Sequence, residues 1–312
     1  MIFIVSMRKF IYILSAIVLL SLVATIGGSC YMVDYALAPN QERQDTAQRF
    51  DSLYENYPQT RLWVDTLRQQ KVLRDTFVLM PSGERHHGYL IGRHSAKGKT
   101  AVIVHGWRNQ GIDILQIARL YQLMGYHVVV PDLHAHGLSE GDAITMGWND
   151  RKDLLHWMEL FRADTMVVHG ISMGAATTMN VSGEKLPAGI RSMKFVEDCG
   201  YTSVWAEFTD QLDSQFGLPP FPLLYASSLL CQLKYGWNFL EAAPLKQIAK
   251  CRYPMLLIHG DADDFVPFWM VHPLYEAKPS PKQLWVTKDT RHALSYKDYP
   301  EEYEIRLRDF LK

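Results

Sequence analysis

A serine flanked by two glycines is the first feature of this sequence that could do covalent chemistry. Residues 170–174 read Gly-Ile-Ser-Met-Gly, after an apolar stretch over 166–169 and before the small residues Ala175 and Ala176. A strand that turns sharply into a helix at such a serine lifts the hydroxyl clear of the backbone, and the glycines leave room for that turn. Free N–H groups at the start of the helix favour developing negative charge. The pattern predicts Ser172 as a nucleophile.

A serine hydroxyl needs a histidine as base, and the histidine needs a carboxylate that orients it. Where the serine occupies a strand-to-helix turn of this kind, the acid follows it in the chain and the histidine comes last. His259 ends an expected strand beside the acid, and His272 begins a helix after it. His292, in a loop before the last helix, is therefore the predicted base. Three carboxylates compete for the role of the acid, and these are Asp261, Asp263 and Asp264.

The order of the expected elements explains how these residues meet. A hairpin is expected over residues 76–80 and 87–91, and buried strands then alternate with helices. This order is typical of one doubly wound, mostly parallel α/β sheet with helices on both faces. Such sheets bind ligands beyond the carboxyl ends of their strands, where the candidate residues fall. Further strands are expected over 99–105, 127–131, 165–169, 193–197, 255–259 and 283–286, and helices over 112–124, 150–161, 173–181 and 301–311.

From about Arg74 to its end, the chain resembles the α/β-hydrolase superfamily, and in particular its prolyl-oligopeptidase-related and serine-aminopeptidase-like members. Within that group the likeness is to bacterial hydrolases with one N-terminal membrane segment. The family's acid loop reads His-Gly-x-x-Asp-x-x-Val-Pro, and residues 259–267 match it completely. The resemblance implies that Asp263 is the catalytic acid and that Asp261 and Asp264 are loop carboxylates.

Two more loops resemble the same family. A His-Gly-Trp-Arg segment follows the third strand, where related enzymes place one oxyanion-binding N–H group. The resemblance implies that the backbone N–H groups of Trp107 and Met173 form the oxyanion hole. Residues 131–141 match the family's Asp-x-x-x-His-Gly-x-Ser loop. That loop is expected to be structural, with a metal site as the alternative for its histidines, His134 and His136.

Composition excludes some classes of partner. The chain of 312 residues has 32 Lys and Arg against 33 Asp and Glu, a formal net charge of -1. Nucleic-acid binding usually needs a clustered basic face, so we expect no nucleic-acid partner. The four cysteines lack metal-ligand spacing, and no metal or cofactor is implied. Cys199 is expected to be a small buried side chain, whereas Cys231 and Cys251 could form a disulfide in an oxidising compartment.

The N-terminal segment predicts association with a membrane. Residues 10–28 are uncharged and apolar, close to the roughly 20 residues that span a bilayer. Arg8 and Lys9 before this run favour a cytoplasmic N-terminus and an extracytoplasmic domain. A single-pass signal anchor is the first interpretation. A cleaved signal peptide and a lipoprotein signal at Cys30 are the alternatives.

Three parts are therefore expected along the chain: residues 1–30 as anchor or signal segment, 31–73 as a helical lead-in, and 74–312 as the catalytic domain. The lead-in should be helical from about residue 41 to 70, with a break at Pro58. Within the catalytic domain, residues 201–250 form a long connection rich in aromatic rings and proline. A small helical cap over the site is expected there, which would suit an apolar acyl group.

Together these features predict a serine hydrolase that cleaves carboxyl esters of modest size through an acyl-enzyme on Ser172. A thioesterase or a peptidase acting on short peptides, of the aminopeptidase-like kind, is the alternative among enzymes, because the same chemistry cleaves those bonds. A non-catalytic binding module on the same fold is the alternative from another class. The sequence keeps a serine, an acid and a histidine in order, which favours the enzyme.

Overall fold

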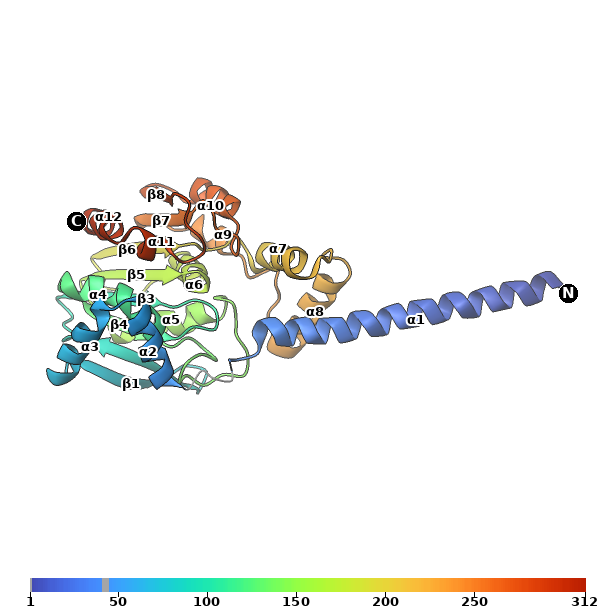
Figure 1. Ribbon diagram of the computed structural model, residues 1–312, viewed down its shortest axis with the longest axis horizontal. Helices are drawn as coiled ribbons and strands as arrows, with labels where there is room; N and C mark the ends of the chain where they lie inside the picture. Colours follow the sequence, from blue (N-terminus) through green and yellow to red (C-terminus); the bar gives the residue numbers. More distant parts are fainter. Residues whose placement is uncertain (1, 41–44) are drawn as a thin grey trace.

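The structure of the protein, a computed structural model, describes residues 2–40 and 45–312. Its centre is an eight-stranded sheet with the order β1-β2-β4-β3-β5-β6-β7-β8 (Figure 1). β1 and β2 form an antiparallel hairpin, β2 is also antiparallel to β4, and the remaining pairs are parallel. The predicted α/β class, with a doubly wound and mostly parallel sheet, is confirmed. The strands are β1 (Leu73–Leu79), β2 (Arg85–Ile91), β3 (Lys99–Val104), β4 (His127–Pro131), β5 (Thr165–Ile171), β6 (Ser192–Asp198), β7 (Met255–Gly260) and β8 (Lys282–Thr287).

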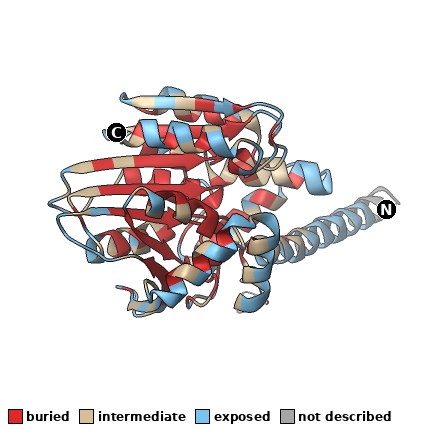
Figure 2. Cartoon of the chain, turned by 60° about the vertical axis from the view of Figure 1, so that its left-hand side comes forward, coloured by how far each residue is buried: buried red, intermediate tan, exposed pale blue. Residues whose placement is uncertain are grey.

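Helices cover both faces of the sheet, because its central strands are apolar on both sides and are buried almost throughout (Figure 2). One face carries α2 (Thr46–Asn56), α3 (Gln59–Gln69), α4 (Leu115–Leu123) and α12 (Pro300–Leu311). The other face carries α5 (Asp150–Leu160), α6 (Met173–Ser182), α9 (Pro244–Ile248) and α10 (Val271–Ala277). Short elements complete the fold, namely η1 (Gly111–Ile114), η2 (Phe268–Met270) and α11 (Ser295–Asp298).

The helices α2 and α3 lie in the segment predicted as a helical lead-in, and the chain breaks between them at Tyr57 and Pro58. Residues 41–44, at the start of that prediction, lie outside the described residues. Leu53 and Val64 are buried and join the core under this face of the sheet. The two helices therefore pack on the domain through a narrow apolar stripe.

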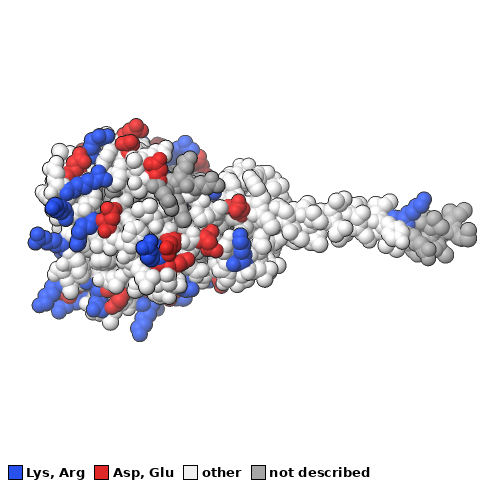
Figure 3. Space-filling model, turned by 90° about the horizontal axis from the view of Figure 1, so that it is seen from below, with Lys and Arg blue, Asp and Glu red and all other residues white. Residues whose placement is uncertain are grey.

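The first helix, α1 (Ile2–Leu37), extends away from the domain as a long rod (Figure 1). The stretch Lys9–Leu37 is long and apolar enough to cross a membrane. Residues 10–28 contain no Asp, Glu, Lys or Arg, and the exposed rod is largely white in the view of Figure 3. The helix does not end near residue 30, because Ser29, Val33 and Leu37 form a stripe that is buried against the domain.

A small helical cap stands beside α1. It consists of α7 (Val204–Phe216) and α8 (Leu223–Tyr235), in the connection between β6 and β7 (Figure 1). α1 and α8 touch closely: a Cβ on Gly28 would lie 2.9 Å from Leu223 Cδ1. The cap also leaves apolar side chains exposed on its outer surface, namely Phe216, Leu218, Phe221, Tyr225, Leu229 and Leu233.

All four cysteines are free thiols in this structure. Cys231 and Cys251 are both buried and are not joined, so the disulfide that the sequence allowed is not formed here. Cys199 is buried in the core beneath the sheet's end, as a small side chain would be. Burial raises the pKa of its thiol well above the ordinary value, so this thiol stays protonated.

Candidate active site

Ser172 occupies a sharp turn between β5 and α6. The strand ends at Ile171 and the helix begins at Met173, which leaves Ser172 at φ 58° and ψ −120°. A positive φ is costly for a residue with a side chain, and such strain is typical of a serine that a turn presents to a substrate. The two glycines of the motif make the turn feasible. A Cβ on Gly170 would collide with the carbonyl oxygen of Gly174, and one on Gly174 with that of Val104.

The structure brings Ser172, His292 and Asp263 into contact. Ser172 Oγ lies 2.9 Å from His292 Nε2, and His292 Nδ1 lies 2.8 Å from Asp263 Oδ2. His292 comes from the loop between β8 and α11, and Asp263 from the loop after β7. With the imidazole proton on Nδ1, the ring donates to the carboxylate, and Nε2 accepts the serine proton. The three predicted residues therefore form a line of contacts from serine to histidine to aspartate.

The Asp263 carboxylate is buried and held by four groups. Its Oδ1 accepts hydrogen bonds from the N–H groups of Phe265 and Val266, at 3.0 and 2.9 Å. Its Oδ2 lies 3.4 Å from His259 Nε2 as well as 2.8 Å from His292. Burial alone would raise the pKa of Asp263, but the hydrogen bonds of His259 and His292 hold it at about 2. This carboxylate is ionised at neutral pH.

His259 is a residue whose contact with the site the sequence did not reveal. Its position at the end of β7 argued against a role as base, and the structure gives it another place: fully buried, it contacts the acid and lies 3.0 Å from the Val266 carbonyl oxygen. Burial disfavours its charged form, yet the Asp263 carboxylate and that carbonyl raise the pKa of His259. The signal was present in the His-Gly-x-x-Asp spacing, which brings the strand end back to the acid.

The two other carboxylates of the acid loop have partners elsewhere. Asp261 Oδ1 accepts a hydrogen bond from the N–H of Asp289 at 2.6 Å, which ties the two loops together. Asp264 pairs with Arg291 at 2.8 Å on the exposed surface. Both therefore shape the loops that carry Asp263 and His292.

The segments expected to bind the oxyanion lie against Ser172. A Cβ on Gly106 would lie 3.4 Å from Ser172 Cβ, so the loop after β3 passes directly beside the nucleophile. Trp107, from that loop, and Met173, the first residue of α6, line the same pocket as Ser172. The loop after β3 and the start of α6 thus meet beside Ser172, and the assignment of these two N–H groups to an oxyanion hole stays a prediction.

The pocket of Ser172 encloses about 450 Å³ of space, part of it open to solvent, and most of its wall is apolar. Glu207, from α7, is an exception that sequence reasoning missed. Its side chain is buried in the wall, and its Oε2 has no hydrogen-bond partner. Burial, reinforced by Asp210 and Asp263, raises the pKa of Glu207 well above the ordinary value. Burial therefore favours the neutral form of this carboxyl over the charged form.

The end of α1 forms part of the same pocket. Ala36 lines it, and the Ala36 carbonyl accepts a hydrogen bond from Trp107 Nε1 at 2.9 Å. Arg108 Nη2 donates to the Tyr35 carbonyl at 2.8 Å, and the N–H of Ile144 donates to the Leu37 carbonyl at 2.7 Å. These three bonds satisfy carbonyl groups that the end of a helix leaves free. The helix is thus fixed to the loop that carries Trp107.

An apolar cavity of about 440 Å³ lies next to this pocket, between α1, α7 and α8. Ala36, Phe208 and Gln211 line both spaces, so the cavity continues the pocket away from Ser172. Met32 and Leu224 belong to its far walls.

The loop over residues 131–141 is built around Asp132. Its Oδ2 accepts hydrogen bonds from His87 Nδ1 at 2.7 Å and from the N–H of Leu138 at 3.0 Å, and its Oδ1 from the N–H of Gly111 at 2.6 Å. His136 also has a structural contact, because its Nε2 accepts from the N–H of Arg108 at 3.2 Å. Since Arg108 belongs to the same loop as Trp107, this hydrogen-bond network helps to hold that loop in place beside the pocket.

A comparison with known families settles the class of this protein. The sequence model of the alpha/beta hydrolase family matches residues 101–304 of this chain. The matched segment includes Ser172, Asp263 and His292. The chain belongs to the alpha/beta hydrolase family. This alpha/beta hydrolase is 28% identical over 254 residues to the uncharacterised protein YqkD of Bacillus subtilis, over 79% of this chain and 82% of that protein. Lipase 1 of Psychrobacter immobilis is 23% identical over 205 residues, 54% of this chain and 63% of the lipase.

Solved structures share the fold of this alpha/beta hydrolase. The esterase Pf2001 of Pyrococcus furiosus superposes with a TM-score of 0.61 at 23% identity, over 77% of this chain and 91% of the esterase. The esterase EaEST of Exiguobacterium antarcticum gives a TM-score of 0.54 at 16% identity. This match covers 76% of this chain and 98% of EaEST. The resemblance inferred from the sequence motifs is confirmed at the level of family and fold, and membership of the family supports hydrolase activity.

Proposed function

We propose that this alpha/beta hydrolase is a membrane-anchored serine esterase that cleaves carboxyl esters with apolar acyl groups. The observation that carries the proposal is the chain of contacts from Ser172 Oγ through His292 to Asp263, at 2.9 and 2.8 Å. Ser172 attacks the ester carbonyl carbon while His292 Nε2 takes its proton. His292 then protonates the departing alkoxide, which leaves an acyl-enzyme. Water activated by His292 releases the acid.

The electrostatics of the site support this assignment of roles. Asp263, with a pKa of about 2, remains ionised and fixes the proton of His292 on Nδ1. It also stabilises the imidazolium that forms when Nε2 takes the serine proton. The N–H groups of Trp107 and Met173 would bind the oxyanion of the tetrahedral intermediate. No step of this chemistry needs a metal or another cofactor.

The pocket supports an apolar substrate. Its walls are mostly hydrocarbon, burial favours the neutral form of Glu207, and the cavity beside Ala36 would hold a chain of several methylenes. Each buried CH₂ contributes about 0.8 kcal/mol to binding, so such a cavity favours longer acyl chains over acetate. A lipase and two esterases among the similar proteins agree with this substrate class.

The helix α1 supports a place at a membrane. We propose that it is an uncleaved single-pass anchor with its N-terminus in the cytoplasm, because Arg8 and Lys9 precede the apolar stretch. The contacts of Tyr35, Ala36 and Leu37 with the domain favour a helix that stays attached, since cleavage close to them would remove their support.

Glu207 gives the peptidase alternative one specific observation in its favour. A buried carboxyl in the wall of the Ser172 pocket could bind the amino group of a peptide, and a bound ammonium would lower the pKa of Glu207 and ionise it. The two functions differ in what Glu207→Gln does. An esterase for apolar groups should keep its rate on butyrate esters, whereas an aminopeptidase should lose activity on aminoacyl substrates.

The test of the proposed function is hydrolysis of p-nitrophenyl acetate, butyrate and octanoate by the full chain in detergent, beside aminoacyl p-nitroanilides. We expect Ser172→Ala to lower kcat/KM on the esters by about 10⁴-fold or more with unchanged circular dichroism, because the nucleophile is gone. Ser52→Ala, on the exposed face of α2 and outside the lining of the pocket, is the matched control. Wild-type protein that cleaves none of these esters and does not label at Ser172 with a fluorophosphonate would refute the esterase.

A further inference from the structure

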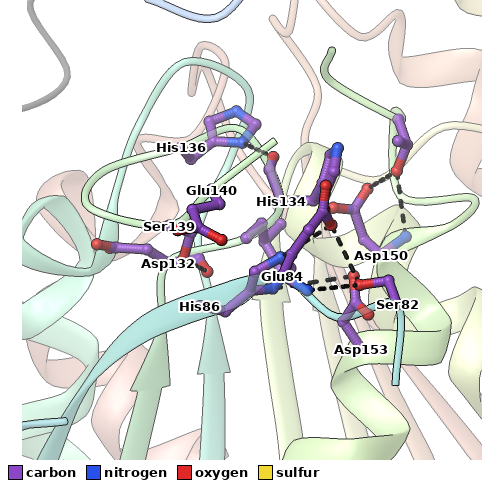
Figure 4. Close-up of polar contacts among 12 residues, drawn as sticks. Ser82, Glu84, His86, Asp132, His134, His136, Ser139, Glu140, Asp150 and Asp153 are labelled. Carbon is purple, nitrogen blue, oxygen red and sulfur yellow. Dashed lines mark hydrogen bonds and ion pairs between the residues drawn. The ribbon is translucent and has the colours of Figure 1, made fainter. Parts of the chain in front are cut away.

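A second group of chemically capable side chains lies near the β1–β2 turn, on the β1–β2 side of the sheet. Glu84 comes from that turn, His86 from β2, and His134 from the loop after β4 (Figure 4). Asp153, from α5, and Asp142 lie beside them. None of these residues lines the pocket of Ser172. The group brings together four separate parts of the chain, and the proposed esterase chemistry leaves it without a role.

The three central side chains have the spacing of metal ligands. Glu84 Oε2 lies 3.1 Å from His134 Nδ1 and 3.7 Å from His86 Nε2, and all three atoms lie within 4.8 Å of one another. Ligands about 2.0–2.1 Å from a tetrahedral zinc ion are about 3.4 Å apart. One carboxylate oxygen and two imidazole nitrogens are also a donor set that suits Zn²⁺ and related transition metals better than Ca²⁺ or Mg²⁺.

His86 gives independent support for a ligand. Its side chain is completely buried, and neither ring nitrogen has a hydrogen-bond partner. A buried polar group without a partner costs free energy, so such a histidine is rare unless something occupies its lone pair. Its Nε2 faces Glu84 at 3.7 Å, toward the centre of the group. A metal ion bound there would satisfy the lone pair of Nε2.

Both histidines have a second carboxylate on the nitrogen that faces away from this centre. Asp153 Oδ2 lies 3.9 Å from His86 Nδ1, and Asp142 Oδ1 lies 3.9 Å from His134 Nε2. At 3.9 Å these pairs are too long for hydrogen bonds; histidines that bind metals usually donate their other N–H to a carboxylate, and a small shift of either side chain would make that bond. The ring of His134 is also held in place, because a Cβ on Gly141 would lie 2.7 Å from His134 Nε2.

The charges around the group favour a cation. The carboxylates of Glu84, Asp142 and Asp153 lie around the two histidines, within 4 Å of a ring nitrogen in each case. A divalent cation at the centre would relieve the repulsion among the carboxylates.

The group is also accessible. Glu84, His134, Asp142 and Asp153 line an open cleft of about 860 Å³, with Asn149 and Lys234 among its other walls. His86 is buried behind Glu84 and His134, and these two residues face the cleft that opens to solvent. A metal ion can enter this way, and water can fill a fourth position.

We propose that Glu84, His86 and His134 bind one divalent transition-metal ion of the zinc class, with Asp153 and Asp142 as second carboxylates on the two histidines. The ion would tie the β1–β2 turn to the loop after β4 and so stabilise the side of the domain next to α5. This site is separate from Ser172 and does not depend on the proposed esterase function.

The experiment uses the full chain in detergent, purified without a polyhistidine tag and freed of metal with a chelator. Equilibrium dialysis against Zn²⁺, with the metal counted by mass spectrometry, should give one equivalent per chain. Co²⁺ in its place should give visible absorption bands of a tetrahedral site. The half-buried His134 offers the safer variant for folding: His134→Gln should lose the equivalent and the bands, with unchanged circular dichroism.

The matched control is His127→Gln, because His127 is also buried without ring partners but has aromatic rings around it rather than carboxylates. It should bind Zn²⁺ as the wild type does, whereas Asp142→Asn should weaken binding by about 10–100-fold. The proposal is overturned if wild-type protein binds less than half an equivalent. It is equally overturned if His134→Gln binds Zn²⁺ with wild-type affinity.

Discussion

Ala36→Phe tests whether the end of α1 is part of the acyl site. Ala36 lines both the pocket of Ser172 and the apolar cavity behind it. Its carbonyl is held by Trp107 Nε1 and the next carbonyl by the N–H of Ile144, so the backbone cannot easily withdraw. A phenyl ring at this position is therefore expected to block the boundary that the two spaces share at Ala36. Chains long enough to pass Ala36 should be excluded, and short ones should still bind.

The size of the effect follows from the methylenes that lose their cavity. An octanoyl group has four more methylenes than a butyryl group, and each contributes about 0.8 kcal/mol when buried. Losing all four costs about 3 kcal/mol, which corresponds to about 10²-fold in kcat/KM. The ratio of kcat/KM on octanoate to that on butyrate should fall by this factor in the variant.

The assay measures that ratio for p-nitrophenyl esters with the full chain in detergent micelles. Ala24→Phe is the control, because it makes the same change on an exposed turn of the same helix. Its ratio should equal that of the wild type. A ratio within threefold of the wild type in Ala36→Phe would refute the acyl site, and so would an equal fall in both variants, since that would report partition into micelles.

Two further predictions concern Asp263. Asp263→Asn should lower kcat on p-nitrophenyl butyrate by about 10⁴-fold, because the asparagine no longer fixes the tautomer of His292. Asp261→Asn should lower kcat by less than tenfold. Stopped-flow or steady-state rates that rank the two variants in reverse would contradict the assignment of the acid. The second prediction is a pH dependence of stability. With a folded pKa of about 2, below the ordinary unfolded value of about 3.9, Asp263 stabilises the folded state by about 2 kcal/mol above pH 4 and loses this contribution as the pH falls from 4 to 2. Urea unfolding of Ser172→Ala and of Ser172→Ala with Asp263→Asn should show a steeper acid loss only in the first protein; parallel curves would refute the depressed pKa.

Local patterns were enough to predict the fold and the environment of Ser172. The alternation of apolar strands with helices is a property of consecutive residues, and so is the turn of two glycines around a serine. Asp263 and His292 could be proposed because chain order and one loop motif restrict the choice. The structure brings these three side chains together, although they lie on loops far apart in the sequence.

The rest depends on contacts that no local pattern encodes. The close approach of Gly28 to Leu223 joins residues 195 positions apart, and nothing near residue 36 indicates that Ala36 lines a pocket. Glu207 looks like an ordinary helical carboxyl until its burial is known. The loop pattern drew attention to His134 together with His136, but His134 faces Glu84 and His86 instead, because β2 lies beside β4 in the sheet.

If α1 is the membrane anchor proposed above, its attachment to the domain would fix where the site stands relative to a bilayer. A hydrocarbon core of about 30 Å takes roughly 20 residues of helix, so a span that starts at Lys9 emerges near Gly28. Met32 and Ala36 then stand only about 6 and 12 Å above the hydrocarbon, at the height of lipid headgroups. An ester dissolved in the membrane would reach Ser172 by lateral diffusion, without crossing bulk water. Its rate of hydrolysis would then follow the mole fraction of substrate in the lipid phase rather than its concentration in solution.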